Sequence, residues 1–240
     1  MRADIFLVEH GYAKSRSEAQ AAIRAKLVRA DGEAIEKPSQ SLAAGASIEY
    51  AKPHPYVSRG GLKLAAALEK FALSPEDRIC LDIGASTGGF TEVLLAGGAA
   101  KVYAIDVGHG QLHPKLARDR RVVRRDGVNA RDLTKQVVPE APDAIVADVS
   151  FIGLKLALPA ALALAAPGAW LVALVKPQFE VGRFAIGKGG VVRDAKAQNA
   201  ALEDIAAWIA ANGWTILGHM ESPIAGGEGN REFLIAAGNK

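Results

Sequence analysis

The pattern of apolar and polar positions divides the chain into a long regular region and a shorter region before it. In the long region, short apolar runs predict five strands, and three stretches with apolar residues at helical spacing predict helices between or after them. This alternation is typical of an α/β fold with a parallel sheet covered by helices on both faces. An antiparallel pair at the end makes the expected sheet seven-stranded and mostly parallel. The expected strands are 79–82, 101–106, 122–123, 144–148 and 170–176, the closing pair is 214–221 and 233–237, and the helices are 91–95, 152–164 and 196–212.

The first 50 residues have a different pattern. Apolar residues recur at helical spacing on both sides of His10-Gly11-Tyr12, which predicts a helix, a turn and a second helix. Ser15 followed by Glu18 is the capping-box pattern at the start of the second helix. Asp31-Gly32 and an apolar run at 47–50 predict short β structure. We therefore expect a small α+β domain over 1–50, a linker with two prolines over 51–57, and a larger domain over 58–240 that begins with a helix at 58–71.

Composition narrows the class of protein. The chain has 240 residues, of which 50% are hydrophobic, so it can bury one large core with a small domain beside it. Its N-terminus lacks the apolar stretch of a signal peptide, and no apolar run approaches the roughly eighteen residues of a membrane span. We expect a cytoplasmic protein without membrane contact. A single cysteine, Cys80, excludes an intramolecular disulfide framework and a cysteine-cluster metal site.

The cations are concentrated in two stretches, although the net charge is only +3. Within 14–29 five cations accompany one acid, and within 115–131 seven accompany two. A basic run taken alone is more often a solvated face. Two such clusters on a protein whose positive and negative charges nearly cancel suggest a polyanionic partner such as nucleic acid.

The stretch 79–98 predicts a strand, a tight glycine turn and a helix. Glycine lets the backbone approach a ligand closely, and the following helix offers unpaired N–H groups, so the turn can hold a nucleotide-like molecule. A dinucleotide fingerprint would need glycine at Ser86, whereas a G-x-S-x-G elbow would make Ser86 a hydrolase nucleophile. A third interpretation is the turn of S-adenosylmethionine (SAM)-dependent methyltransferases, with an acid at the end of the next strand for the ribose. It predicts cofactor contacts from Asp82, Gly84, Ala85, Ser86, Gly88, Gly89, Phe90 and Asp106, while the alternative is that the two acids merely cap loops.

Charged residues also stand at the ends of later predicted strands. Asp148 follows AIVA, Lys176 follows LVALV, and Glu232 begins the last strand. A charge directly after a strand buried on both faces either lines a ligand site or is a solvated terminus. For Asp148 and Lys176 together, a site is the better interpretation. Lys63 falls off the apolar stripe of its helix, which by itself favours an ordinary surface lysine.

The N-terminal region resembles the small RNA-binding domain named after ribosomal protein S4. The resemblance rests on R-x-D-x-x-L, G-x-x-x-S-R-x-x-A, I-x-x-x-x-V and D-G, which begin at residues 2, 11, 23 and 31. It implies that one basic edge of the two helices binds folded RNA. Cations on one helical face fit this role because they neutralise phosphates and release counterions. The implied RNA contacts are Arg2, Lys14, Arg16, Arg24 and Lys26, and the alternative is a plain helical cap with surface arginines.

The whole chain resembles the TlyA family of ribosomal RNA 2′-O-methyltransferases, whose catalytic domain is similar to the FtsJ (RrmJ) Rossmann-like enzymes. The motifs that carry the resemblance are SRGGLKL, LDIGASTGGFTEVLL, YAIDVGHGQL, DVSFI, LVKPQFEVGR and GKGGVVRD. The resemblance implies a catalytic tetrad of Lys63, Asp148, Lys176 and Glu232 and a SAM site at the glycine turn and Asp106, with Asp126 as an adenine contact. It implies a cytidine in ribosomal RNA, free or in a ribosomal subunit, as the target. No metal is needed, because the cofactor carries its own leaving group.

The segment 182–189 superficially matches a phosphate loop but has Gly189 where magnesium binding needs Ser or Thr. We interpret it as a loop over the site, with Arg183 and Lys188 meeting RNA phosphate, against the alternative of a plain surface loop. Arg59, in the SRGGLKL motif, is a further expected RNA contact. The functional alternatives are a cytolysin, since members of the family have also been described as haemolysins, an RNA-binding assembly factor without catalysis, and an NAD enzyme.

Overall fold

The computed structural model describes residues 1–51, 54–182, 186–226 and 229–239. Its contacts divide the chain into two units, Met1–Pro55 and Tyr56–Lys240. Among the helices in these described ranges, none combines the length and the apolarity that crossing a membrane requires.

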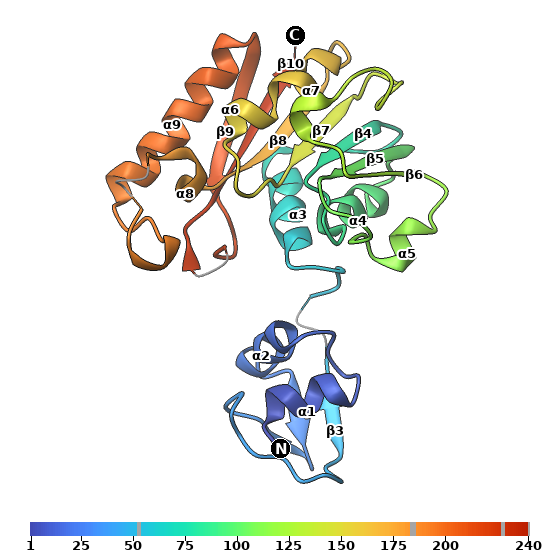
Figure 1. The fold of residues 1–240 in the computed structure, drawn as a ribbon, viewed down its shortest axis with the longest axis vertical. Coiled ribbons are helices and arrows are strands. Elements are labelled where there is room, and N and C mark those ends of the chain that lie inside the picture. The colour runs from blue at the N-terminus through green and yellow to red at the C-terminus, as the bar shows by residue number, and fades with distance from the viewer. Residues whose placement is uncertain (52–53, 183–185, 227–228, 240) are drawn as a thin grey trace. The chain divides into compact units, whose positions relative to one another are not determined.

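The N-terminal unit has two helices packed on a small antiparallel sheet (Figure 1). The predicted helix, turn and second helix are confirmed, and Ser15 caps the second helix by accepting the N–H of Glu18 at 3.2 Å. The Glu18 carboxylate reaches back to the N–H of Lys14 at 2.9 Å. The elements are α1 (Ala3–Glu9), α2 (Arg16–Arg24), β1 (Val28–Ala30), β2 (Glu33–Ala34) and β3 (Ile48–Tyr50), with strand order β2-β1-β3.

A buried acid holds the two helices of this unit together. The side chain of Asp4 is fully buried and accepts hydrogen bonds from Arg2 at 3.0 Å, Arg16 at 2.9 Å and Gln20 at 2.9 Å. The hydrogen bond from Arg2 is the largest reason why the pKa of Asp4 lies well below its usual range. Two of the predicted RNA contacts, Arg2 and Arg16, are therefore also structural, although about half of each side chain stays exposed.

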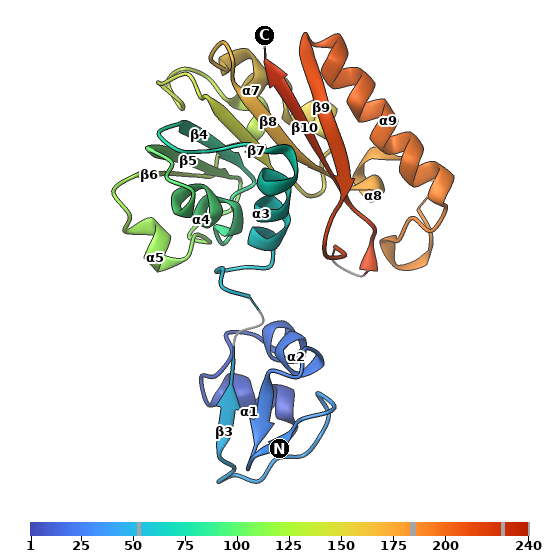
Figure 2. The same ribbon diagram turned by 180° about the vertical axis from the view of Figure 1, so that it is seen from behind.

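The larger unit is built on the mostly parallel, seven-stranded sheet that the sequence predicts (Figures 1 and 2). Strands β4 to β8 run parallel, and β10 lies antiparallel between β8 and β9. The strand order is β6-β5-β4-β7-β8-β10-β9. The bounds are β4 (Ile79–Ile83), β5 (Lys101–Asp106), β6 (Val122–Asp126), β7 (Ala144–Ala147), β8 (Trp170–Val175), β9 (Trp214–Glu221) and β10 (Phe233–Asn239).

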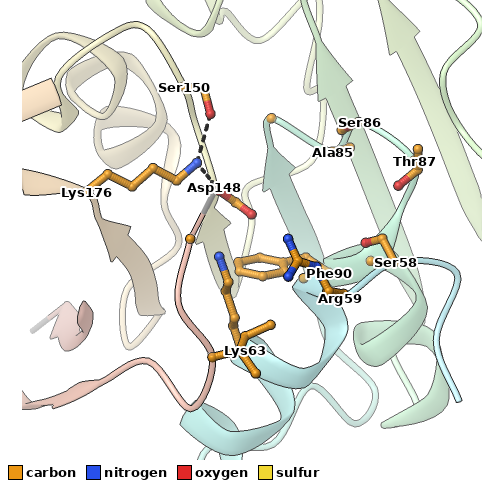
Figure 3. Close-up of a pocket in the computed structure, with 15 residues that line it drawn as sticks. Ser58, Arg59, Lys63, Ala85, Ser86, Thr87, Phe90, Asp148, Ser150 and Lys176 are labelled. Carbon is orange, nitrogen blue, oxygen red and sulfur yellow. Dashed lines mark hydrogen bonds and ion pairs between the residues drawn. The ribbon is translucent and has the colours of Figure 1, made fainter. Parts of the chain in front are cut away.

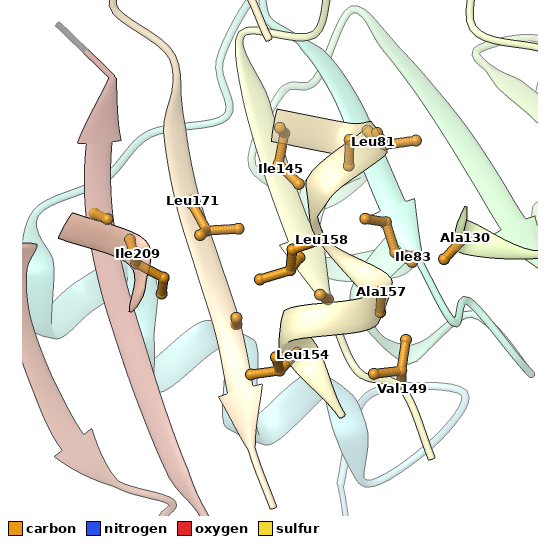
Figure 4. Packing of buried hydrophobic residues seen from close by; sticks show 14 of the residues in the cluster. Leu81, Ile83, Ala130, Ile145, Val149, Leu154, Ala157, Leu158, Leu171 and Ile209 are labelled. Atoms are coloured by element: carbon orange, nitrogen blue, oxygen red, sulfur yellow. The ribbon is translucent and has the colours of Figure 1, made fainter. Parts of the chain in front are cut away.

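Helices cover both faces of this sheet and bury a separate apolar cluster on each. One face packs against α6, α7 and α9, as Figure 4 shows for part of the cluster, and the other packs against α3, α4 and α5. The single helix expected at 152–164 is instead two helices, because Pro159 starts a new one and has no N–H to continue the first. The helices are α3 (Gly60–Phe71), α4 (Gly89–Ala96), α5 (Pro114–Ala117), α6 (Leu154–Ala157), α7 (Pro159–Leu164), α8 (Pro177–Glu180) and α9 (Ala195–Ala211), with short 3₁₀ turns at Ala130–Asp132 and Lys188–Gly190.

The strand order reverses between β4 and β7, at the centre of the sheet. From β4 the chain first proceeds outward through β5 to β6, and it then returns to β7 on the other side. Loops that leave two such strands diverge, so a crevice opens at their carboxyl ends, where open α/β sheets bind ligands. The glycine turn follows β4 and Asp148 follows β7, which places both at this crevice.

Candidate active site

The glycine turn and the loop after β7 are in direct contact. The N–H of Asp148 donates to the carbonyl of Ile83 at 2.9 Å. Gly84 has φ +79°, and a Cβ at this position would lie 2.5 Å from the carbonyl oxygen of Asp148. Any side chain at residue 84 would therefore push the two loops apart, and only glycine adopts this backbone conformation without strain.

A second glycine brings helix α4 against the start of α3. A Cβ at Gly89 would lie 2.2 Å from the hydroxyl oxygen of Ser58, just before α3. Because residue 89 has no side chain, the two helix N-termini lie side by side, and both Ser58 and Gly89 line one cavity. The sequence pattern predicts the turn but does not show this contact, because its partner lies about thirty residues earlier in the chain.

Asp106, at the end of β5, holds the glycine turn through its carboxylate. One oxygen accepts the N–H of Ser86 at 2.7 Å, and the other accepts the N–H of Gly108 at 2.7 Å. The side chain of Gln111 links Ser86 to Asp106. Its amide oxygen accepts the hydroxyl of Ser86 at 3.1 Å, and its amide nitrogen donates to the Asp106 carboxylate at 3.4 Å. A carboxylate has about four acceptor positions, so Asp106 retains acceptor capacity toward the cavity that it lines.

Two cavities meet at the carboxyl ends of β4 and β7. The smaller, of about 300 Å³, is mostly polar and contains Lys63, Asp148 and Lys176 (Figure 3). The larger, of about 870 Å³, has Asp106 on one wall and mainly apolar side chains elsewhere. Gly84, Ser86, Asp148 and Ser150 line both. A molecule in the larger cavity can thus place a reactive end beside the polar groups of the smaller one.

Lys176, directly after β8, is nearly buried and held from two sides (Figure 3). Its ammonium lies 2.6 Å from a carboxylate oxygen of Asp148 and donates to the hydroxyl of Ser150 at 2.9 Å. A lysine ammonium has three N–H donors, so one remains for a molecule in the cavity. Ser150 is the partner that sequence reasoning missed, and its position two residues after Asp148 in the DVSFI motif is the signal that could have identified it.

Lys63 is buried rather than an ordinary surface lysine. It lies on α3 with a relative exposure of 8%, and its ammonium is 2.5 Å from Glu232, whose exposure is 3%. Phe233, the first residue of β10, pairs antiparallel with Val175, the last residue of β8. Glu232 and Lys176 consequently stand at adjacent strand ends. Lys63 lines the smaller cavity, whereas Glu232 is absent from its described lining. Glu232 therefore acts through its ion pair with the Lys63 ammonium.

Asp82 does not line either cavity in the described part of the chain. It points to the same face of β4 as Cys80, is fully buried, and accepts the hydroxyl of Thr91 on α4 at 2.6 Å. Burial, together with the negative charges of Asp148 and Asp106, raises the pKa of Asp82 to about 7, although the hydrogen bond from Thr91 acts in the opposite direction. The structure therefore gives Asp82 a role beneath the turn, joining β4 to α4, and its cofactor contact stays a prediction.

This buried acid predicts a pH dependence of stability. The pKa is about 7 in the folded chain and near 4 when unfolded, so the folded state binds the extra proton between these values and stability falls as pH rises. We expect the stability advantage of Asp82→Asn over wild type to grow by roughly 2 kcal/mol from pH 5 to pH 8. Urea unfolding followed by tryptophan fluorescence measures it, because all three tryptophans, at 170, 208 and 214, lie in the larger unit. A difference that does not change with pH would contradict the assignment.

The remaining predicted contacts are placed as follows. Asp126, at the end of β6, accepts the N–H of Gly110 at 2.8 Å and is not among the described lining residues of either cavity, so its adenine contact stays a prediction. Arg59 is exposed and lines the smaller cavity. Arg183 lies outside the described residues, as does the side chain of Lys188. In the N-terminal unit Lys14, Arg24 and Lys26 are exposed.

An exposed aromatic side chain stands at the rim of the larger cavity. Phe151 is 92% exposed and has φ +65°, a strained conformation for a residue other than glycine. Its ring lies 5.4 Å from that of Phe179 on α8. Glu180, next to Phe179, accepts the N–H of Leu154 at 2.9 Å and so joins α8 to the start of α6. The loops after β7 and β8 are thus braced against each other at the site.

The comparisons with known proteins cover the whole chain. The family model of FtsJ-like methyltransferases matches residues 56–239, and that of the S4 domain matches residues 1–48. The chain is 44% identical over 236 residues to the 16S/23S rRNA (cytidine-2′-O)-methyltransferase TlyA of Mycobacterium tuberculosis, which covers 98% of this chain and 88% of that protein.

Solved structures agree with these matches. The structure of a protein of Streptococcus thermophilus that is named as a hemolysin superposes on this chain with a TM-score of 0.80 at 42% identity. The match covers 100% of this chain and 88% of that one. An O-methyltransferase of Bacillus cereus, in complex with S-adenosylhomocysteine, superposes with a TM-score of 0.51 over 76% of this chain and 82% of that one. The second likeness, at 20% identity, concerns the fold alone.

Proposed function

The chain belongs to the TlyA family, in which an S4 domain precedes an FtsJ-like methyltransferase domain, and we propose that it transfers a methyl group from SAM to the 2′-hydroxyl of a cytidine in ribosomal RNA. The observation that carries the proposal is the convergence of Lys63, Asp148 and Lys176 on one small polar cavity beside the glycine turn. Because ribosomes work in the cytoplasm, we propose that the chain acts there.

The residues of the larger cavity fit SAM by their chemistry. Asp106 retains one acceptor position on its carboxylate beside its contacts with Ser86, Gly108 and Gln111, and the long Gln111 contact at 3.4 Å can give way to a second ribose hydroxyl. Val107 and Val128 supply apolar wall suited to an adenine ring, and the backbone at Gly84 and Ser86 lies open to the methionine portion. When bound, SAM supplies an electrophilic methyl group on a sulfonium that is itself the leaving group.

In this proposal Lys176 acts on the attacking oxygen. A ribose hydroxyl is a poor nucleophile at neutral pH, so negative charge that develops on its oxygen must be stabilised. The remaining N–H donor of Lys176 can bind this oxygen, while Asp148 and Ser150 fix the direction of the ammonium. The methylation releases one proton overall, which passes to solvent through the open end of the polar cavity.

Lys63 and Glu232 are proposed to position the ribose. Lys63 lines the cavity, and Glu232 holds its ammonium in place at 2.5 Å. A second fixed ammonium in the same cavity as Lys176 restricts how the sugar can lie, and correct orientation of reactants contributes several kcal/mol to barrier lowering. The S4 domain is proposed to bind the RNA outside the site through its exposed cations, which include Lys14, Arg24 and Lys26.

The proposed function is tested by methyl transfer in vitro. Purified protein is incubated with methyl-labelled SAM and ribosomal RNA, either protein-free or in isolated subunits, from cells that lack this protein. We expect label at a single cytidine, and nuclease digestion followed by mass spectrometry should find it on the ribose. Label on a base, or no label on any of these substrates while SAM binding is intact, would refute the proposal.

A further inference from the structure

One group of cationic side chains belongs neither to the buried core nor to the proposed catalytic site. It consists of Lys115 on α5, Arg118 and Arg120 just after α5, and Arg124 on β6, and we call it the β6-edge surface. We propose that this surface binds the phosphate backbone of the RNA beside the target nucleotide, as a second RNA-binding surface of the chain within the methyltransferase unit. The inference rests on the proposed function and extends it from the cavity to the edge of the sheet.

The charges of the β6-edge surface are available to a partner. All four side chains are exposed. Lys115 pairs with Glu92 and Arg124 with Asp126, but neither Arg118 nor Arg120 is in an ion pair with the described residues. The neighbouring Asp119 is bound mainly by Arg121 at 2.8 Å, and the charge of Arg120 attracts it more weakly without an ion pair. Exposed, unpaired guanidinium groups are well suited to phosphate because their donors match its oxygens.

The surface is structurally continuous with the candidate active site. The N–H of His113, at the start of α5, donates to the carbonyl of Thr87 at 3.2 Å, and Thr87 lines the smaller cavity together with Arg59. Leu116 of α5 closes over Gly88, where a Cβ would lie 2.3 Å from its side chain. Helix α5 is therefore fixed against the glycine turn itself. From its Lys115 the cations run through Arg118 and Arg120 along the outside of the unit to Val122, where β6 begins.

The position of the surface favours RNA over other polyanions. Strand β6 is at the edge of the sheet, so no further strand covers it. A membrane-binding surface normally adds exposed apolar anchors to its cations. Among the described residues, the large exposed apolar side chains are Met1, Tyr12, Val107, Phe151, Leu156 and Leu217, and none of them is on α5 or β6. An RNA whose ribose enters the smaller cavity has phosphates on both sides, and one side can follow this wall.

The test removes the two unpaired arginines and leaves the catalytic cavity intact. Binding of the full chain to protein-free ribosomal RNA is measured across a series of salt concentrations for wild type, Arg118→Gln/Arg120→Gln, and the control Lys70→Gln/Lys196→Gln, which loses the same charge from exposed sites on α3 and α9. We expect the first variant to bind about tenfold more weakly near 0.1 M salt and its log–log salt slope to be shallower by roughly 1.5, because two phosphate contacts are lost. The control should bind like wild type, and SAM affinity should be equal in all three.

Three results would separate the possibilities. If wild type binds and methylates the RNA but the arginine variant keeps the affinity and slope of the control, the β6-edge surface is not an RNA-binding surface. If wild type neither binds nor methylates ribosomal RNA, the proposed function fails, and the inference fails with it. If the arginine variant loses binding to vesicles of phosphatidylglycerol but keeps RNA binding, the surface recognises lipid headgroups and the proposal is overturned.

Discussion

Replacing Lys176 by alanine is expected to lower the rate of methyl transfer by at least about a thousandfold while SAM still binds. The ammonium contacts both Asp148 and Ser150 in the polar cavity, and the substitution removes the donor that we assign to the attacking oxygen. Asp148 is partly exposed but its oxygen facing Lys176 is buried, so water that enters the space left by the lysine side chain must solvate this oxygen. The loss should therefore appear in kcat rather than in the stability of the fold. Single-turnover transfer of labelled methyl to ribosomal RNA measures it.

The control for this variant is Lys155→Ala. Lys155 on α6 is also ion-paired, with Asp204 at 2.6 Å, but it does not line either cavity in the described part of the chain. Its replacement should leave the rate within about twofold, because a surface ion pair contributes little. If Lys176→Ala turned over at a rate near that of Lys155→Ala, Lys176 would not be the group that stabilises the attacking oxygen.

Most of the fold is predictable because its signals are local. Five parallel strands, the closing pair and the helix at 195–211 follow from apolar periodicity, and the capped second helix of the N-terminal unit follows from Ser15 and Glu18. The break at Pro159 shows the limit of periodicity, since the apolar spacing continues across a residue that cannot donate the next hydrogen bond. The position of β10 between β8 and β9 depends on pairing between distant segments, which no local pattern encodes.

The site is predictable where one strand end carries one chemical group, and less so where distant residues meet. Asp106, Asp148 and Lys176 are visible as polar residues after apolar strands. Lys63 looks like a surface residue from its helix alone, because its partner Glu232 is 169 residues away. Asp82 stands in the turn motif, which predicts a cofactor contact, while strand alternation points its side chain into the apolar layer toward Thr91. A sequence motif therefore identifies the part of the chain that forms the site, but the direction of each side chain determines whether it faces the cavity or the core.

Replacing Asp106 by alanine is expected to weaken SAM binding by about a hundredfold. Two effects act together in this variant. The carboxylate proposed to accept the ribose hydroxyls is lost, and the N–H groups of Ser86 and Gly108 lose the acceptor that holds the turn. A hundredfold change corresponds to about 3 kcal/mol, which is what hydrogen bonds to one charged group supply. Calorimetric titration with SAM gives the dissociation constant directly.

Two comparisons distinguish cofactor binding from a general loosening of the turn. Asp106→Asn retains one oxygen for a backbone N–H but presents its NH₂ group to the other, so its affinity should lie between those of wild type and Asp106→Ala. Asp126→Ala removes the acid at the end of the adjacent strand, whose carboxylate accepts the N–H of Gly110 and which is not in the described lining of the larger cavity. It should weaken binding less than Asp106→Ala does, because it removes the predicted adenine contact alone and leaves both the ribose acceptor and the hydrogen bonds that hold the turn. Equal losses for Asp106→Ala and Asp126→Ala would show that the whole edge of the turn, rather than the Asp106 carboxylate, determines affinity.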